Sequence, residues 1–254
     1  MKLGWLLPFC RRSGAVQMAI DRWLLDRVEM GEMEGPVLRF YQWAAPTLSL
    51  GFHQKLSSLP KGVGELDVVR RPTGGRAVLH QATGELGDLT YGIVADGLGT
   101  HRRRAYERLC QFLRRGLLDL GVEVSFGEGG RGYVGEASCF RTATAADLCW
   151  RGRKLVGSAQ VWRRQVVLQH GTILLQPDRE LWERVLPGSS QGVVGVNEVL
   201  SNPVEIDRAI ATLTHAASDC LGVRWQPLSL SGEDWQVIAD LSSQFSLPSA
   251  TRQK

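Results

Sequence analysis

Apolar side chains recur at intervals of three or four residues in several stretches of the chain, a spacing typical of amphipathic helices. The longest apolar stripe begins after Thr100, which can cap a helix, and it is closed by Gly121. Asn202, followed by a proline and an acid, marks another helix start. The pattern predicts helices over residues 13–30, 100–120, 178–186, 203–220 and 233–245.

Short runs rich in β-branched and aromatic residues predict strands. These runs are residues 37–43, 47–51, 68–71, 78–79, 89–94, 122–126 and 166–175. A turn at Arg151 and Gly152 between apolar runs predicts a β-hairpin. The small residues Gly157, Ser158 and Ala159 are interpreted as a further turn. Helices and strands alternate irregularly, which predicts an α+β fold with a mixed central β-sheet flanked by helices.

Two connections lack periodicity. Residues 127–138 are rich in glycine and lead to Cys139, and residues 187–197 are interpreted as a mobile surface loop. No repeat or low-complexity linker divides the chain. We therefore expect residues 1–254 to form a single catalytic domain, with the C-terminal helices from about residue 203 packed on it.

The composition is that of an ordinary soluble protein, with 43% hydrophobic and 22% charged residues. No apolar run approaches the roughly 20 residues that a membrane-spanning helix needs. The arginines of the N-terminal segment follow its apolar patch, whereas a secretory signal peptide carries its positive charge first. These features predict a cytoplasmic protein with no membrane contact.

The five cysteines are widely spaced and form no C-x-x-C pair, and the five histidines are scattered. Neither a disulfide framework nor a metal site is predicted. Cys110 and Cys220 fall on apolar helix stripes and Cys149 lies within a strand, so these three are expected to be buried packing residues.

The formal net charge is +4, and arginines cluster at residues 70–71, 102–104, 114–115 and 163–164. Clusters of this kind are usually solvated faces. A mildly basic surface also suits an acidic protein partner or nucleic acid, through long-range attraction. Nothing resembling a helix-turn-helix precedes the domain, so nucleic acid is the least favoured partner.

The segment from residue 70 to residue 80 reads RRPTGGRAVLH. Paired glycines let a backbone approach a ligand closely, and the amides around them can bind an anion or line an acyl channel. Taken alone, a segment with these residue types is more often an ordinary turn. It is not a Walker loop, because the glycine spacing and the Gly-Lys-Ser/Thr ending are absent.

Lys154 follows the predicted hairpin turn, with Arg151 and Arg153 beside it. Cationic neighbours disfavour the ammonium form and would make this lysine a better proton acceptor, although a surface strand lysine is normally solvated. Cys139 follows glycine, serine and acidic residues, a context that favours an accessible loop thiol over a core residue. An exposed thiol near a cation is a candidate nucleophile. We expect Cys139 and Lys154 to meet.

Four motifs in this order resemble those of the biotin/lipoate A/B protein ligase family. They are VRRPTGGRAVLH (residues 69–80), LTY (89–91), GRKLVGSAQ (152–160) and LQHGTILL (168–175). The resemblance runs from about residue 13 to residue 200. It implies the family's catalytic fold, and it implies substrate-binding roles for Arg71, Thr73, Gly74, Gly75, Arg76, His80, Gly157, Ser158, Ala159, Gln160, His170 and Gly171.

Within the family the chain is most similar to the octanoyltransferases whose cysteine precedes the lysine. Arg76 stands where ATP-using lipoate ligases typically have a third glycine. The sequence ASCF (residues 137–140), followed by Asp147, replaces the segment that such ligases carry before the hairpin. Residues 81–88 differ from the shorter, more acidic link that relatives have between the VRRPTGGRAVLH and LTY motifs. The resemblance therefore does not define the lip of the substrate site.

The resemblance implies octanoyl transfer from acyl carrier protein to a lysine of a lipoyl-domain protein, such as glycine-cleavage H protein or a dehydrogenase E2. Cys139 would form a thioester and Lys154 would move the proton, with no cofactor and no ATP. Amides near Gly74 and Gly75, or near Gly157 and Ser158, would stabilise the oxyanion. Apolar residues on the sheet would form a tunnel for the chain.

Three other functions stay open. The first is an ATP-dependent lipoate–protein ligase, and the second is an amidotransferase that moves octanoyl groups between lipoyl proteins. The third is a non-catalytic module that binds an acidic carrier, for which the basic cluster at Arg102, Arg103 and Arg104 would be the docking surface.

Overall fold

The computed structural model describes residues 1–59, 66–81, 87–127 and 147–247. Its large sheet contains β1 (Lys2–Arg12), β2 (Val37–Trp43), β6 (Asp88–Ala95), β7 (Ser125–Phe126), β8 (Leu148–Trp150), β9 (Arg153–Arg163), β10 (Val166–Leu174) and β11 (Val223–Pro227). Across this sheet the strand order is β11–β1–β2–β6–β10–β9–β8–β7, with both parallel and antiparallel neighbours. The predicted mixed central sheet is confirmed.

A smaller sheet contains β3 (Thr47–Leu50), β4 (Asp67–Arg70), β5 (Val78–His80) and β12 (Ser246–Leu247), in the order β12–β4–β3–β5. The helices are α1 (Gly14–Glu29), a short 3-10 helix (Leu56–Ser58), α2 (Arg102–Asp119), α3 (Arg179–Val185), α4 (Val196–Val199), α5 (Ile206–Leu221) and α6 (Gly232–Ser242). None of the helices in the described ranges is long and apolar enough to cross a bilayer.

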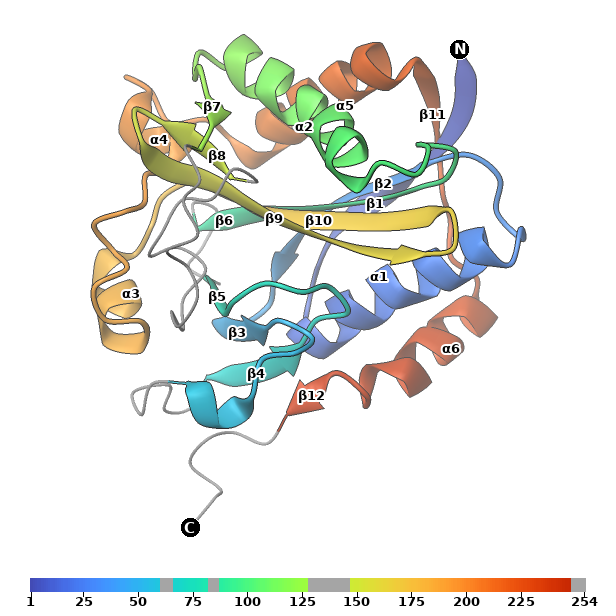
Figure 1. Ribbon diagram of the computed structural model, residues 1–254, viewed down its shortest axis with the longest axis horizontal. Coiled ribbons are helices and arrows are strands. Elements are labelled where there is room, and N and C mark those ends of the chain that lie inside the picture. Colours follow the sequence, from blue (N-terminus) through green and yellow to red (C-terminus); the bar gives the residue numbers. More distant parts are fainter. Residues whose placement is uncertain (60–65, 82–86, 128–146, 248–254) are drawn as a thin grey trace.

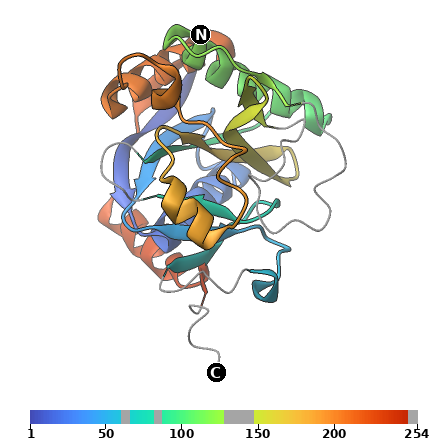
Figure 2. The same ribbon diagram turned by 90° about the vertical axis from the view of Figure 1, so that its left-hand side faces the viewer.

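The elements form layers around the large sheet. In Figure 1, α2 and α5 lie above this sheet, while α1 lies below it, between the sheet and α6. Figure 2 shows α3 in front of the region where the two sheets come together. Trp182 of α3 belongs to the same buried cluster as Leu48 and Leu79 of the smaller sheet. The helices therefore cover the large sheet on both faces, as the α+β prediction requires.

Strand β1 was not predicted, although it lies second in the large sheet. It pairs in parallel with β2 and with β11, and α1 connects β1 to β2. Gly4 and Pro8 weaken its strand pattern, since both residues are poor strand formers. Gly4 is needed here because a Cβ atom would lie 2.6 Å from Cγ1 of Val223 and 2.9 Å from the carbonyl oxygen of Pro36. The register shifts between Leu7 and Cys10, next to the proline.

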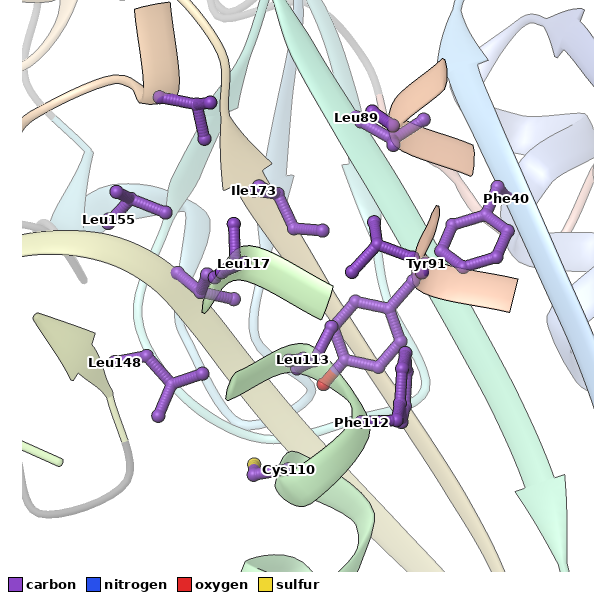
Figure 3. Packing of buried hydrophobic residues seen from close by; sticks show 14 of the residues in the cluster. Phe40, Leu89, Tyr91, Cys110, Phe112, Leu113, Leu117, Leu148, Leu155 and Ile173 are labelled. Carbon is purple, nitrogen blue, oxygen red and sulfur yellow. The ribbon is translucent and has the colours of Figure 1, made fainter. Parts of the chain in front are cut away.

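The apolar stripe of α2 packs on one face of the large sheet, as predicted (Figure 3). Tyr91 of β6 meets Phe112 edge-on, with ring centroids 5.6 Å apart and planes at 85°. Cys110 is fully buried in the same cluster, which we call the α2 core; it also includes Leu113, Leu117 and Ile173. Edge-on aromatic pairs of this kind stabilise a core beyond their buried area.

Several predicted boundaries were wrong. Helix α2 begins at Arg102, with His101 rather than Thr100 at the cap position. Helix α5 begins at Ile206 with Glu205 at the cap position, so Asn202 lies outside it. Of the predicted strand 122–126, only Ser125 and Phe126 form β7, while the Val122 amide donates to the Leu117 carbonyl at the end of α2.

The predicted surface loop at residues 187–197 is largely a buried connection. Val193, Val194 and Val196 are almost completely inaccessible to solvent. Val193 forms an isolated β-bridge with Lys154, and the Lys154 amide donates to the carbonyl of Gly192 at 2.9 Å. The prediction was wrong because three buried valines lie among glycine and polar residues without a regular spacing, so periodicity did not indicate their burial.

Candidate active site

Lys154 begins β9 immediately after the predicted hairpin turn. Arg151 and Gly152 both have positive φ, 48° and 78°, as a tight turn between β8 and β9 requires. The Lys154 side chain is 1% exposed, and its Nζ lies 2.7 Å from Oδ1 of Asp147, which is buried as well. The hairpin thus carries its lysine into the interior.

The neighbouring arginines contact other groups, and their expected effect on Lys154 stays a prediction. The Arg153 guanidinium donates to the Val193 carbonyl at 2.5 Å, and the Arg151 guanidinium lies 4.6 Å from the centre of the Trp150 ring. The charge in contact with Lys154 is the Asp147 carboxylate, which stabilises the ammonium form by Coulomb attraction.

A β-bulge directs Lys154. The register between β8 and β9 shifts so that Leu148 faces Val156 while Cys149 faces Lys154. Leu155 and Val156 both pack in the α2 core. Side chains otherwise alternate along a strand, so Lys154 is directed to the opposite face of the sheet from Leu155. Bulges re-aim side chains in this way and are frequent near active sites.

The predicted turn at Gly157, Ser158 and Ala159 is wrong, because these residues continue β9 without a break. They pair with β10, with Ser158 opposite Gly171. In the described part of the chain, β8 pairs with β9 only up to Val156, so the segment from 157 to 163 has one strand neighbour. Small residues mark a close contact here, and not a reversal of the chain.

A pocket lies on the face of the large sheet that carries α1 and adjoins the smaller sheet. It encloses about 430 Å³ of empty space, part of which is open to solvent. Its predicted lining residues are Arg71, Gly75, His80, Gly157, Ser158, Ala159, His170 and Gly171. The pocket brings together residues from four separate motifs, and its surface is mainly apolar.

Seven further lining residues were not predicted: Met18, Tyr41, Trp43, Ser49, Val78, Thr90 and Thr172. Met18 belongs to the buried stripe of α1, and Tyr41 and Trp43 belong to the fully buried strand β2. Their pattern is that of an ordinary core, so periodicity alone does not separate them from packing residues. Their proximity to the motifs was the signal that could have found them.

Four predicted residues lie outside the pocket lining. Gly74 and Gln160 line a neighbouring surface groove, which Arg71 also borders. Thr73 is buried just behind the pocket, where it contacts His170. Arg76 contributes its backbone carbonyl to the turn and lines neither hollow. The structure therefore brings eight of the twelve predicted binding residues to one surface.

The turn at residues 72–75 is fixed by Arg71 beneath it. The Arg71 guanidinium donates to the carbonyls of Gly74 at 2.8 Å, Arg76 at 2.7 Å and Ser49 at 2.8 Å. Gly75 has a φ of 94°, in the left-handed region that favours glycine. A Cβ atom on Gly51 would lie 1.9 Å from the Gly75 carbonyl oxygen, so the turn and β3 touch through backbone alone.

His170 lies on β10 between α1 and the turn. Its Nδ1 is 2.7 Å from Oδ2 of Asp21, and its Nε2 is 2.7 Å from Oγ1 of Thr73. The other oxygen of Asp21 accepts from Nη1 of Arg39 at 2.8 Å, in a fully buried ion pair. Arg39 also donates to the backbone and side-chain oxygens of Gln17. The ring is therefore held at both nitrogens.

His80 has an equivalent arrangement on β5. Its Nδ1 lies 3.1 Å from Oδ2 of Asp88, and its Nε2 lies 2.8 Å from Oγ of Ser49. The ring stacks on Trp43, with centroids 3.8 Å apart and planes at 14°. Burial lowers the pKa of His80, partly offset by Asp88, so the His80 ring is uncharged at neutral pH.

Cys139 lies outside the described residues, so its expected meeting with Lys154 stays a prediction. Two other thiols near the site are unreactive by environment. Burial and, to a smaller extent, Asp147 raise the pKa of Cys149 to about 11, against the lowering effect of Lys154. Burial likewise raises the pKa of Cys110 to about 12. Both were predicted to be packing residues, and both are buried.

The mixed sheet with helices on both faces, the pocket and the buried hairpin lysine define a fold of the lipoate/biotin protein ligase type. A lipoate-protein ligase A bound with ATP has the same fold, with a TM-score of 0.80 at 21% identity over 96% of this chain and 95% of that one. A bipartite lipoate protein ligase from Thermoplasma acidophilum, solved in work that includes its E2 lipoyl domain, has a TM-score of 0.76 at 19% identity, covering 96% of this chain and 93% of that one.

The model of the lipoyl protein ligase A/B catalytic domain matches residues 13–218, and the chain belongs to this family. The octanoyltransferase LipM of Carboxydothermus hydrogenoformans is 41% identical over 189 residues, which are 71% of this chain and 68% of the relative. The octanoyltransferase LipM of Kyrpidia tusciae is 32% identical, with 94% of this chain and 95% of the relative covered. The predicted family and the predicted octanoyltransferase class are confirmed.

Proposed function

We propose that the chain transfers an octanoyl group from an acyl carrier protein to a lysine of a lipoyl-domain protein through a thioester on Cys139. The observation that carries this proposal is the buried Lys154 and Asp147 pair, directed by a bulge to the sheet face on which Gly157 and Ala159 line an apolar pocket. A buried lysine held by a carboxylate, on a strand that also lines an apolar pocket, is suited to moving a proton during acyl transfer.

In the first half-reaction, the Cys139 thiolate, held by the Lys154 ammonium, attacks the thioester carbonyl of the donor. The carbon–sulfur bond to the carrier breaks, and the carrier thiolate takes a proton from the Lys154 ammonium. In the second half-reaction, the acceptor amine attacks the new thioester, an amide forms, and Cys139 leaves as the thiolate. Lys154, neutral after the first half-reaction, takes the proton that the amine loses, which restores the ammonium beside the Cys139 thiolate. Thioester-to-amide transfer is downhill, so no ATP is used.

The pocket supports an octanoyl substrate in particular. Its lining is mainly apolar, and its two histidines have both ring nitrogens hydrogen-bonded to protein groups. An alkyl chain in this pocket therefore displaces water without leaving a buried polar group unpaired. Amides of the 72–75 turn, or those of β9 beyond Val156 that point away from β10, are suited to stabilise the oxyanion.

The same proposal assigns the partners and the domain. The acceptor is a lipoyl-domain protein of the glycine-cleavage H or dehydrogenase E2 type, and the donor carrier docks at Arg102, Arg103 and Arg104, which are exposed at the start of α2. Residues 1–254 act as one catalytic domain. The pairing of β11 with β1 and of β12 with β4 supports this, because it joins the C-terminal segment to both sheets.

The decisive experiment is intact-mass measurement after mixing the protein with octanoyl carrier protein in the absence of ATP. We expect one octanoyl adduct that is lost in Cys139→Ser and is passed on when a lipoyl domain is added. A matched Cys220→Ser variant, half-buried on α5, retains the adduct. An adduct that needs ATP and free lipoate would overturn the proposal in favour of a ligase. An adduct formed only from octanoylated lipoyl protein would establish an amidotransferase instead.

A further inference from the structure

Two series of buried hydrogen bonds, from different parts of the chain, end on the same turn. The first runs from Asp21 on α1 through His170 on β10 to Thr73, with distances of 2.7 and 2.7 Å. Thr73 belongs to the 72–75 turn itself, and its carbonyl accepts from the Phe52 amide at 2.9 Å. This series therefore connects the turn to the large sheet.

The second series reaches the turn from the smaller sheet. Asp88 contacts His80 at 3.1 Å, and His80 contacts Ser49 Oγ at 2.8 Å. Nη1 of Arg71 lies 3.3 Å from that Oγ and 2.8 Å from the Ser49 carbonyl, while Nη2 donates to the Gly74 carbonyl. Each series has the same chemical order of carboxylate, imidazole and hydroxyl.

The carboxylate decides which way each series points. A carboxylate only accepts, so each histidine must carry its proton on Nδ1, and Nε2 must accept from the hydroxyl. The other oxygen of Asp21 accepts from Arg39, and the other oxygen of Asp88 accepts from the backbone amide of Gln81 at 3.1 Å. Neither carboxylate can turn away without leaving a buried donor unpaired, so both ring orientations are fixed.

We propose that Asp21 and Asp88 are positioning residues for acyl transfer: acting through His170 and Thr73 on one side, and through His80, Ser49 and Arg71 on the other, they hold the 72–75 turn in the place that the bound acyl group requires. This inference rests on the proposed function. Neither carboxylate lines the pocket, and each acts only through the histidine it orients. Holding the turn from two sheets fixes its position relative to both.

The direction of the hydrogen bonds is tested by the ¹⁵N and ¹H resonances of the imidazole rings, assigned with single His→Gln variants. Both rings are expected to carry a proton on Nδ1. In Asp21→Asn the single amide oxygen must serve Arg39, so the amide nitrogen faces His170, which moves its proton to Nε2 while His80 is unchanged. Asp88→Asn does the converse. The Nε2–H form in the unaltered protein, or no change in either variant, would overturn the proposal.

The functional consequence is tested without altering a buried charge. Thr73→Val keeps the shape of the side chain and removes the hydroxyl. We expect the KM for the octanoyl donor to rise about tenfold, with kcat within about threefold and the Tm lower by only about 2–6 °C, because roughly one hydrogen bond to the turn is lost. Thr73→Ser restores the KM. Thr212→Val, at a position on α5 outside the pocket lining, serves as the matched control.

A KM that stays at the control value in Thr73→Val, or one that Thr73→Ser does not restore, would overturn the positioning role. Asp21→Asn and Thr73→Val combined should raise the KM no more than the larger single effect, because both act on one series. Fully multiplicative effects would contradict this. If the unaltered protein transfers no octanoyl group, the proposed function fails, while the imidazole measurement still reports on the two series.

Discussion

Two buried ion pairs of nearly equal length have different chemical capacities. Arg39 and Asp21 are 2.8 Å apart, and Lys154 and Asp147 are 2.7 Å apart, with both cations about 1% exposed. Arginine stays protonated in proteins, whereas a lysine can release its proton. Arg39 also donates to Gln17 and lies 3.9 Å from the centre of the Tyr41 ring, so it joins α1 to β2.

The difference shows that burial and pairing alone do not identify a reactive group. The arginine pair holds a helix to a sheet and orients His170, and it has no proton to exchange. The lysine pair lies where a bulge interrupts β9, next to the segment that leads from Cys139. A cation that can lose its proton, placed at an irregularity in a strand, is the stronger indication of chemistry.

The largest expected effect, on the rate of octanoyl transfer, comes from replacing the lysine of the Lys154 and Asp147 pair with arginine. Lys154→Arg keeps the charge but cannot accept a proton, so we expect octanoyl transfer to fall by about a thousandfold, within the range for a lost acid–base group. Single-turnover transfer to a lipoyl domain measures it. Arg115→Lys, in an exposed pair with Asp119 on α2, is the control and should behave as the unaltered protein. Retention of a tenth of the activity in Lys154→Arg would refute the role of the lysine.

Removing the carboxylate of each ion pair should lower the free energy of unfolding by different amounts. Asp21→Asn leaves Arg39 buried and charged without its partner, so the free energy of unfolding should fall by about 3–5 kcal/mol. Asp147→Asn should cost less than half as much, because Lys154 can neutralise itself by losing its proton. Urea unfolding followed by tryptophan fluorescence measures both. Equal losses in the two variants would show that the lysine is held charged as firmly as the arginine.

A smaller effect tests the strand pair between the two sites, since Lys154 begins β9 and His170 lies on β10. In Gly171→Ala the new Cβ would lie 2.4 Å from Oγ of Ser158 and 2.8 Å from Cε1 of Tyr91. We expect a loss of about 1–3 kcal/mol from overpacking. Gly152→Ala meets no atom within 4 Å and should lose only about 1 kcal/mol, through its positive φ. A larger loss in Gly152→Ala, measured by thermal unfolding, would contradict the packing argument.

The smallest effect uses Cys149, which faces Lys154 across the hairpin, as a reporter of the lysine pair. Asp147 raises the pKa of Cys149 and Lys154 lowers it, in addition to the larger effect of burial. Asp147→Asn should therefore lower this pKa from about 11, so that the thiol signal disappears at a lower pH. The Raman S–H band of a chain with its other cysteines changed to alanine measures this. Lys154→Met should shift the transition upward, and a shift in the same direction for both variants would be inconsistent with the pair.

The parts of the fold with an uninterrupted local pattern were predictable. Helices α1 and α2 follow their apolar stripes, and the turn at Arg151 and Gly152 was located from residue type. Strand β1 was not, because Gly4 and Pro8 break the pattern where the chain touches β11 and β2. In β9, Gly157, Ser158 and Ala159 have the residue types of a turn, but their small size allows close contact with Tyr91 and Gly171.

The site was predictable as a set of motifs but not as an arrangement. The resemblance located the residues of the Gly74 and Gly75 turn and the two histidines. It gave no indication that Asp21 and Asp88 orient those histidines, because these contacts join residues 149 and 8 positions apart. The bulge at Lys154 was also hidden, since it depends on how β8 and β9 align and not on either strand alone.

The position of β1 has a consequence for how this chain is made. One edge of β1 pairs with β2, which is synthesised early. The other edge pairs with β11, which ends at Pro227 and is synthesised near the end of the chain. Until the ribosome has released that stretch, the nascent protein presents a half-finished sheet whose open backbone groups invite pairing with other chains. During this interval of synthesis, the rate at which the chain is completed, or the binding of a chaperone, determines whether it folds or aggregates.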